Sequence, residues 1–276
     1  MVLLNRILVS IIAIPLLLFI VMCGEISSFV VLEASIVIMM NEFYSMLKRN
    51  KVKVSAKTGI VIGILIPLIC HFSGKSYPDS ISLLLASSVI LFITRRVSQE
   101  SIRESIDSIS YTLFGILYIP YLFNYALLLR MEFGSAITFL GINITNGRFW
   151  LLVMFGISFG SDIASFAAGK LFGRNRLTTI SPNKTIEGLI GAVLFGFALG
   201  LYLNRIIDIS IYKSLALTVI GVILAQLGDL GSSLFKREFG IKDYSSIMMS
   251  HGGLLDRCDS VLFTAPFVFY FVKFLI

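Results

Sequence analysis

Long apolar runs separated by short polar segments make up most of this chain. A helix that spans a bilayer needs about 20 mostly apolar residues, with a range of about 17 to 25. The pattern therefore predicts about nine spanning helices, at residues 7–23, 28–46, 58–73, 79–94, 109–129, 148–169, 187–206, 213–231 and 257–275. Neither an internal repeat nor a linker to a soluble domain is visible, so we expect one all-α membrane domain over residues 1–276.

Composition agrees with a polytopic membrane protein. The chain is 57% hydrophobic and only 14% charged, with a mean hydropathy of +0.91, whereas soluble proteins contain roughly a quarter charged residues. The first run has no clear small-residue cleavage site, so we interpret residues 7–23 as a retained span. Cys23, Cys70 and Cys258 are widely spaced and lack CxxC partners, which supports neither a disulfide framework nor a zinc site.

The distribution of positive charge predicts the orientation in the membrane. If the N-terminus is cytoplasmic, 17 of the 23 basic residues fall on the cytoplasmic side. The remaining six lie outside: Lys75, Arg130, Arg148, Arg205, Lys213 and Lys273. By the positive-inside rule we expect the N-terminus inside and the C-terminus outside. We ascribe the net charge of +7 to loops that face anionic lipid rather than to nucleic-acid binding. This predicts a multi-pass protein of the cytoplasmic (inner) membrane.

Several aspartates lie in or at the ends of the predicted spans: Asp162, Asp229, Asp256 and Asp259. An ionised Asp at the centre of a spanning helix costs about 2.5 to 3.5 kcal/mol, so four without compensation approach about 10 to 14 kcal/mol. That cost rivals the whole stability of a typical domain, about 5 to 15 kcal/mol. We therefore expect cations, basic side chains or water beside these carboxylates.

The spacing of the polar residues indicates where they meet. In QLGDLGSSLFKR, four of them follow i, i+3, i+7 and i+10 and so share one helical face: Gln226, Asp229, Ser233 and Lys236. At the next span, Asp256 and Asp259 share a face in the same way. Two acidic faces thus flank one basic loop.

Carboxylates with few soft ligands nearby favour hard cations, and Mg²⁺ is often bound by one or two carboxylates together with substrate phosphates. Neighbouring basic residues would bind the remaining phosphate charge. The pattern therefore predicts metal-assisted phosphoryl or nucleotidyl transfer. For any single pair of charges, an ion pair that only ties two helices together is an equally good interpretation.

A second polar cluster, GKLFGRNRLTTISPNKTIEG, runs from Gly169 to Gly188. Thr185 and Glu187 lie at the start of the seventh span, where backbone amides and Lys184 would form an anion site. The cluster lacks the GxxxxGK[ST] spacing of a P-loop, and GxxxG is also a helix-packing pattern. In the preceding span, helix packing explains the small residues around Asp162 but not Asp162 itself.

The stretch SLFKREFGIKDYSSIMMSHGGLLDRCD resembles the signature of the phosphatidate cytidylyltransferase family, the CDP-diacylglycerol synthases. Eleven positions match: Ser233, Lys236, Arg237, Lys242, Asp243, His251, Gly252, Gly253, Asp256, Arg257 and Asp259. Supporting matches are QLGDL, SPNKTIEG and SDIASFAAGKLFG. The first five spans, residues 1–147, match only in length and hydropathy, so residues 148–276 are expected to form the catalytic part. The sequence departs from the family at residues 248–250, Met-Met-Ser, where an Ile-Pro-Gly-like turn is usual.

The resemblance implies transfer of CMP from CTP to phosphatidic acid, with Mg²⁺ and with room for a second cation such as K⁺. It assigns Asp229 and Asp256 as metal ligands and implies a homodimer, with membrane lipids as neighbours and the active site facing the cytoplasm. The catalytic residues are then Asp229, Lys236, Arg237, Lys242, Asp243, His251, Asp256, Arg257 and Asp259. The substrate-binding residues are Asp162, Lys184, Thr185, Glu187, Ser233, Gly252 and Gly253.

The sequence leaves alternatives for the role of His251 and for the function of the protein. A phosphate monoester with a second pKa near about 6 is largely dianionic at neutral pH, so we favour a positioning role for His251 over proton transfer. The alternative functions are a CTP-dependent lipid kinase, which would release CDP instead of pyrophosphate, and an ion-coupled transporter. The transporter is disfavoured because the membrane carboxylates fall mostly in the C-terminal half and no repeat is visible.

Overall fold

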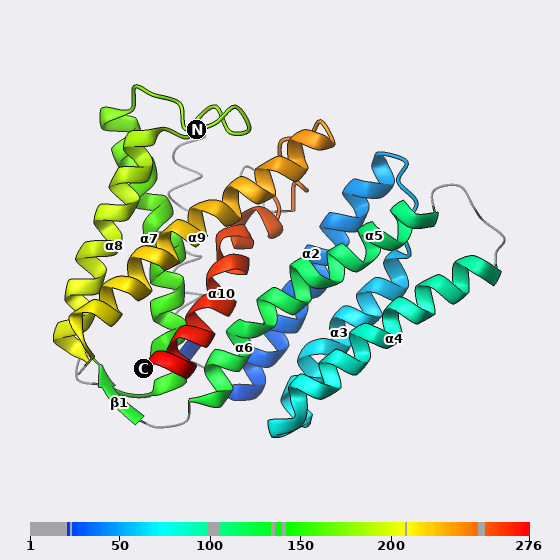
Figure 1. Cartoon of the computed structure of the whole chain (residues 1–276), viewed down its shortest axis with the longest axis horizontal. Helices are drawn as coiled ribbons and strands as arrows, with labels where there is room; N and C mark the ends of the chain where they lie inside the picture. The colour runs from blue at the N-terminus through cyan, green and yellow to red at the C-terminus, as the bar shows by residue number, and fades with distance from the viewer. Residues whose placement is uncertain are drawn as a thin grey trace.

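The computed structural model describes residues 21–22, 24–98, 105–133, 136–139, 142–207, 209–247 and 252–276. These residues are predominantly helical (Figure 1). The helices are α2 (Glu25–Arg49), α3 (Ala56–Phe72), η1 (Gly74–Ser76), α4 (Tyr77–Ser98), α5 (Ser105–Ile116), η2 (Leu117–Tyr121), α6 (Leu122–Glu132), α7 (Asn146–Phe172), α8 (Ile186–Ile206), α9 (Ile211–Glu238) and α10 (Leu255–Leu275). One antiparallel hairpin, β1 (Ala136–Phe139) and β2 (Ile142–Thr145), precedes α7 and pairs Phe139 with Ile142.

Seven helices among the described residues are long and apolar enough to cross a membrane, and α3, with 17 residues, is a shorter apolar helix. The chain is therefore a multi-pass helical membrane protein, as its hydropathy predicts. Every predicted span from 28–46 onward falls on one of these helices. The first predicted span, 7–23, lies almost wholly outside the described residues. Nine spans and the orientation of the two termini stay predictions.

Several helices are longer than predicted, and two of these differences have a clear physical reason. The span predicted at 109–129 is a continuous helix from Ser105 to Glu132, with a π-helical turn at Leu117–Tyr121 that contains Pro120. Proline cannot donate the regular i to i−4 hydrogen bond, so the ladder widens there. Helix α9 continues past the predicted end at residue 231 to Glu238. Lys236 and Arg237 lie in its last turn, where positive charge stabilises the C-terminal end of the helix dipole.

The helices that carry the predicted site residues pack side by side. In Figure 1, α7, α8 and α9 lie on one side, α3 and α4 lie on the other, and α10 and α6 run between them. Helices α9 and α10 approach closely at Gly228, where a Cβ atom would lie 2.5 Å from the carbonyl oxygen of Asp259. This approach brings Asp229, the next residue on α9, beside the acidic start of α10.

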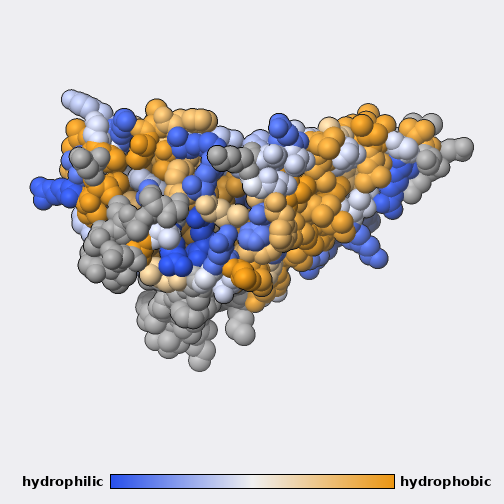
Figure 2. All heavy atoms as spheres, turned by 90° about the horizontal axis from the view of Figure 1, so that it is seen from below, coloured by the Kyte–Doolittle hydropathy of each residue, from blue (hydrophilic) through white to orange (hydrophobic). Residues whose placement is uncertain are grey.

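Aromatic rings join the N-terminal helices to α9. Phe235 of α9 lies 4.8 Å from the Phe114 ring and 6.5 Å from the Phe43 ring, measured between centroids. Tyr118 of η2 stacks on Phe114 at 5.2 Å. Hydrophobic side chains cover much of the face seen in Figure 2, whereas hydrophilic ones gather near its middle and toward its ends. The broad apolar surface fits a protein surrounded by lipid.

Candidate active site

A chain of polar contacts joins the loop before α8 to three helices. The ammonium of Lys184 lies 2.7 Å from Oδ2 of Asp229 on α9 and donates to Oε1 of Gln226 at 3.2 Å. Gln226 donates through Nε2 to Oδ1 of Asp162 on α7 at 3.0 Å. Ser260 of α10 donates through its hydroxyl to the other oxygen of Asp162 at 3.3 Å. The loop, α7, α9 and α10 therefore meet at one polar centre.

A second lysine–aspartate pair lies between α9 and α10. The Lys236 ammonium is 2.8 Å from Oδ1 of Asp256, and the two side chains are only 10% and 4% exposed. Oδ2 of Asp256 accepts the backbone N–H groups of Tyr244 at 3.0 Å and Gly253 at 2.9 Å. The Lys236 ammonium also lies 5.6 Å from the centre of the Tyr244 ring. Burial raises the pKa of the Tyr244 hydroxyl, so this phenol stays neutral and donates to the Ser232 carbonyl at 3.4 Å.

The Gly-Gly pair before α10 is required by the backbone. Gly252 has φ of +79°, in the left-handed region that favours glycine, and a Cβ atom there would lie 3.0 Å from Oδ2 of Asp256. A Cβ atom on Gly253 would lie 2.7 Å from Oε1 of Glu42. The pair therefore lets the backbone pass between two carboxylates. His251 and the Met-Met-Ser turn at 248–250 lie outside the described residues, so the predictions for them stay predictions.

The other predicted residues differ in exposure. Arg237 is exposed at the end of α9 and donates through Nε to the Ile180 carbonyl at 3.3 Å, which ties α9 to the loop that carries Lys184. Lys242, Asp243 and Arg257 are exposed near the same end of α9 and α10. Ser233 and Asp259 are instead 7% and 5% exposed and lie inside the helix packing. Basic side chains thus remain accessible around the two buried or half-buried aspartates.

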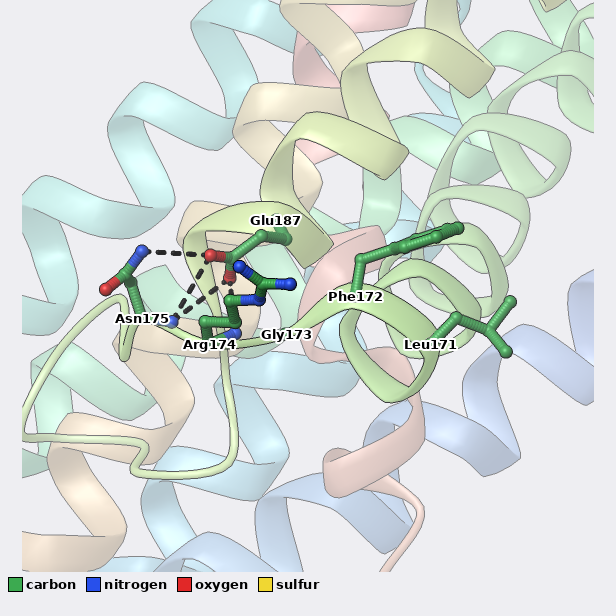
Figure 3. Close-up of a pocket in the computed structure, with 6 residues that line it drawn as sticks. All are labelled: Leu171, Phe172, Gly173, Arg174, Asn175 and Glu187. Carbon is green, nitrogen blue, oxygen red and sulfur yellow. Dashed lines mark hydrogen bonds between the residues drawn. The ribbon is translucent and has the colours of Figure 1, made fainter.

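Thr185 and Glu187 organise the loop between α7 and α8. Thr185 caps α8 by accepting the backbone N–H of Gly188 at 3.0 Å. The Glu187 carboxylate accepts the backbone N–H of Arg174 at 3.1 Å and the side-chain amide of Asn175 at 3.0 Å. Figure 3 shows Glu187 facing Arg174 and Asn175, whereas Leu171 and Phe172 point away from it. These residues and Gly173 line a hollow of about 520 Å³.

This arrangement differs from a simple anion site at the start of α8. Glu187 uses its carboxylate to fix the loop backbone, and the Lys184 ammonium turns toward Asp229 instead of toward the first amides of α8. The loop thereby delivers a cation to the polar centre between α7 and α9. The sequence predicted Lys184 as a substrate-binding residue, which stays a prediction, and did not indicate that its ammonium contacts Asp229.

Glu42 of α2 lies against the loop that carries the predicted Gly252 and Gly253, and the sequence analysis did not identify it. It is 3% exposed, and its carboxylate accepts hydrogen bonds from the loop and the start of α10, more than 200 residues away in the chain. The available signal was a carboxylate within an apolar helix, which commonly marks function in membrane proteins. Nothing in the local sequence relates Glu42 to the Gly-Gly loop.

Taken together, the fold and site define a multi-pass membrane protein with two lysine-paired aspartates, Asp229 and Asp256, near exposed basic residues at the end of α9 and the start of α10. Residues 4–275 match the model of the Cytidylyltransferase family, and the chain belongs to that family. It is 31% identical over 261 residues to a phosphatidate cytidylyltransferase of Synechocystis sp., covering 86% of this chain and 85% of that protein.

Two further relatives are similar in the same way. The phosphatidate cytidylyltransferase of Staphylococcus saprophyticus is 32% identical over 227 residues, which cover 80% of this chain and 81% of the relative. Phosphatidate cytidylyltransferase 4, chloroplastic, of Arabidopsis thaliana is 32% identical over 232 residues, which cover 77% of this chain and 56% of the relative. The likeness therefore extends well beyond the signature at residues 233–259.

Proposed function

We propose that this protein is a phosphatidate cytidylyltransferase, which transfers CMP from CTP to phosphatidic acid and releases pyrophosphate. The observation that carries the proposal is the pairing of Asp229 and Asp256, on neighbouring spans, with Lys184 and Lys236 at 2.7 and 2.8 Å. Both pairs include a residue of α9, and together two carboxylates and two ammonium groups can balance both a metal ion and a polyphosphate. The names of the relatives supply the same substrates.

The donor set fits Mg²⁺. Asp229 and Asp256 carry hard oxygen donors, and each already lies against a positive charge. Among the described residues no three His, Cys, Asp or Glu side chains form a metal-binding group, so substrate phosphates and water would complete the shell, as is usual for this ion. We propose that Asp229 and Asp256 bind Mg²⁺ together with the triphosphate. Bound there, it would neutralise phosphate charge and polarise the reacting phosphoryl group.

The basic residues have separate tasks in this proposal. Lys184 and Lys236 would turn from their aspartates to phosphate oxygens when the nucleotide binds. The exposed cations around the site, Arg237, Lys242 and Arg257, would bind the remaining phosphates of the two substrates. Asp229 and Asp256 are held by helices α9 and α10, and the cations carry permanent positive charge, so we ascribe to these residues positioning and charge neutralisation rather than proton transfer.

The chemical step is an in-line displacement. An oxygen of the lipid phosphate attacks the α-phosphorus of CTP, an O–P bond forms, and the bond from the α-phosphorus to the bridging oxygen breaks. The electron pair leaves with pyrophosphate. A dianionic phosphate monoester is already a nucleophile, so the step requires no strong base. We further propose that the site faces the cytoplasm, that the lipid enters sideways from the inner leaflet, and that the protein is a homodimer of the cytoplasmic membrane.

One assay tests the proposal. Purified full-length protein is incubated in mixed micelles with phosphatidic acid, CTP labelled at the α-phosphorus, and Mg²⁺. We expect the label to enter the lipid and pyrophosphate to appear in equal amount, with no reaction after chelation by EDTA. Diacylglycerol, which lacks the phosphate, is the control lipid and should accept no label. Release of CDP with no label in the lipid would contradict the proposal and indicate a kinase.

A further inference from the structure

Glu42 is a buried carboxylate on a helix outside the predicted catalytic half. It is 3% exposed within α2, and its neighbour Phe43 packs against Phe235 of α9. Its Oε1 atom accepts the Ser245 hydroxyl at 2.6 Å and the Leu254 backbone N–H at 3.0 Å. Its Oε2 atom accepts the Leu255 backbone N–H at 2.8 Å. Both oxygens of Glu42 are therefore bonded to the loop and the start of α10.

The bonds to Glu42 satisfy backbone N–H groups at the start of α10 that have no acceptor within the helix. The first N–H groups of a helix have no partner within the helix, and negative charge is stabilising beside them. Helix α10 begins at Leu255, and its N-cap residue Leu254 makes no side-chain capping bond. Glu42 supplies the missing cap from α2. The Glu42 carboxylate therefore fixes the first turn of α10 against the N-terminal half of the protein.

The same loop binds Asp256 on its other side. Gly253 donates its N–H to Asp256 at 2.9 Å, while the absence of a Cβ atom at this position lets Glu42 approach. Asp256 in turn contacts Lys236. If the loop moved away from Glu42, the Gly253 N–H that binds Asp256 would move with it, and the Asp256 carboxylate would change its orientation. Asp256 belongs to the proposed metal and phosphate site.

We propose that Glu42 is a positioning residue of the active site: from α2, it caps α10 and fixes the Gly252–Gly253 loop so that Asp256 is oriented for the reaction. This role rests on the proposed cytidylyltransferase function. Glu42 does not touch the reacting groups, so its contribution is to the orientation of Asp256 rather than to substrate contact. Through Glu42, helix α2 would then contribute to the orientation of a catalytic group.

The test compares Glu42→Gln with Glu33→Gln in the full-length protein. Glu33 lies on the same helix, and neither of its carboxylate oxygens has a hydrogen-bond partner within the described part of the chain. We expect Glu42→Gln to lower kcat by about ten- to a hundredfold, because small misplacements of catalytic groups have effects of that size. The KM for CTP should change by less than about threefold, because the phosphate-binding cations remain in place. Glu33→Gln should keep the wild-type kcat.

Hydrogen–deuterium exchange provides a readout that does not depend on activity. The amides of Leu254 and Leu255 should exchange faster in Glu42→Gln and at the wild-type rate in Glu33→Gln. The conservative variant Glu42→Asp keeps the charge and should recover part of both kcat and protection. Wild-type kcat in Glu42→Gln, or an equal loss in both Gln variants, would overturn the proposal. If the wild-type protein forms no CDP-diacylglycerol, the proposed function fails, and the exchange data alone then decide whether Glu42 caps α10.

Discussion

Lys236 and Asp256 form an ion pair that is almost completely removed from solvent, with 2.8 Å between the ammonium and the carboxylate and side chains 10% and 4% exposed. The pair joins the end of α9 to the start of α10 across a loop of charged residues. Removing one partner of a buried pair leaves the other charge uncompensated, whereas removing both does not. Stability should therefore fall when one partner is removed and recover when both are removed. Activity should be lost in both cases, because Lys236 and Asp256 belong to the proposed site.

The substitution Lys236→Met should lower the free energy of unfolding by about 3 to 5 kcal/mol, the usual effect of breaking a buried pair. The double variant Lys236→Met/Asp256→Asn should regain most of that stability but no activity. Thermal unfolding in detergent measures the first effect, and CDP-diacylglycerol formation measures the second. Equal stability of the single variant and the wild type would show that the pair does not stabilise the fold.

The substitution Asp229→Asn should abolish nucleotidyl transfer while the protein stays folded in the membrane. The Asp229 side chain is 30% exposed, and its partner Lys184 keeps Gln226 as an acceptor, so the substitution removes the proposed metal ligand while Lys184 retains a hydrogen bond. The expected loss in kcat is about a hundredfold or more, typical for a group that stabilises transition-state charge. Size-exclusion chromatography provides the folding control. Turnover near the wild-type rate in the purified variant would refute the metal assignment.

The substitution Lys184→Met should weaken nucleotide binding. Its ammonium lies 2.7 Å from Asp229, and a hydrogen bond to a charged group contributes about 1.5 to 3 kcal/mol, so we expect the KM for CTP to rise by about tenfold or more. Lys170→Met is the matched control, because Lys170 is an exposed lysine at the end of α7. Similar KM values for both variants would contradict a phosphate-binding role for Lys184.

The substitution Glu187→Gln should loosen the loop between α7 and α8. Its carboxylate accepts backbone N–H groups of Arg174 and Asn175, and a neutral amide accepts such bonds less strongly. We expect faster tryptic cleavage after Arg174 and Arg176, with a smaller effect on kcat than Asp229→Asn has. Cleavage at the wild-type rate together with a large rise in the KM for CTP would instead favour direct substrate contact by Glu187.

Hydropathy was sufficient to predict most of the helices, because the bilayer requires apolar runs whose backbone groups are satisfied within the helix. Hydropathy predicted the ends of the helices less accurately. Helix α9 extends through Lys236, beyond the apolar run, because positive charge stabilises the C-terminal end of a helix. The hairpin at Ala136–Phe139 and Ile142–Thr145 was not predicted, since its strands are too short to produce a clear pattern.

Helical spacing placed Gln226, Asp229 and Lys236 on one face of α9, and the structure shows Gln226 and Asp229 sharing Lys184 as a partner. Spacing could not show that Lys236 instead contacts Asp256, since that pairing depends on how the loop returns to α10. The resemblance to the family assigned Gly252 and Gly253 as substrate-binding residues. Their position between the carboxylates of Asp256 and Glu42 is a property of the assembled fold.

The sequence by itself determined that this is a helical membrane protein with a cytidylyltransferase signature, because hydropathy, charge spacing and motif are local properties of the chain. The tertiary structure decided which charges compensate one another: Lys184 with Asp229, Lys236 with Asp256, and Glu42 with the first amides of α10. Within a membrane each polar group needs a partner, yet several partners of suitable charge were present in the chain. Helix packing selected among them by bringing only certain groups within hydrogen-bond distance.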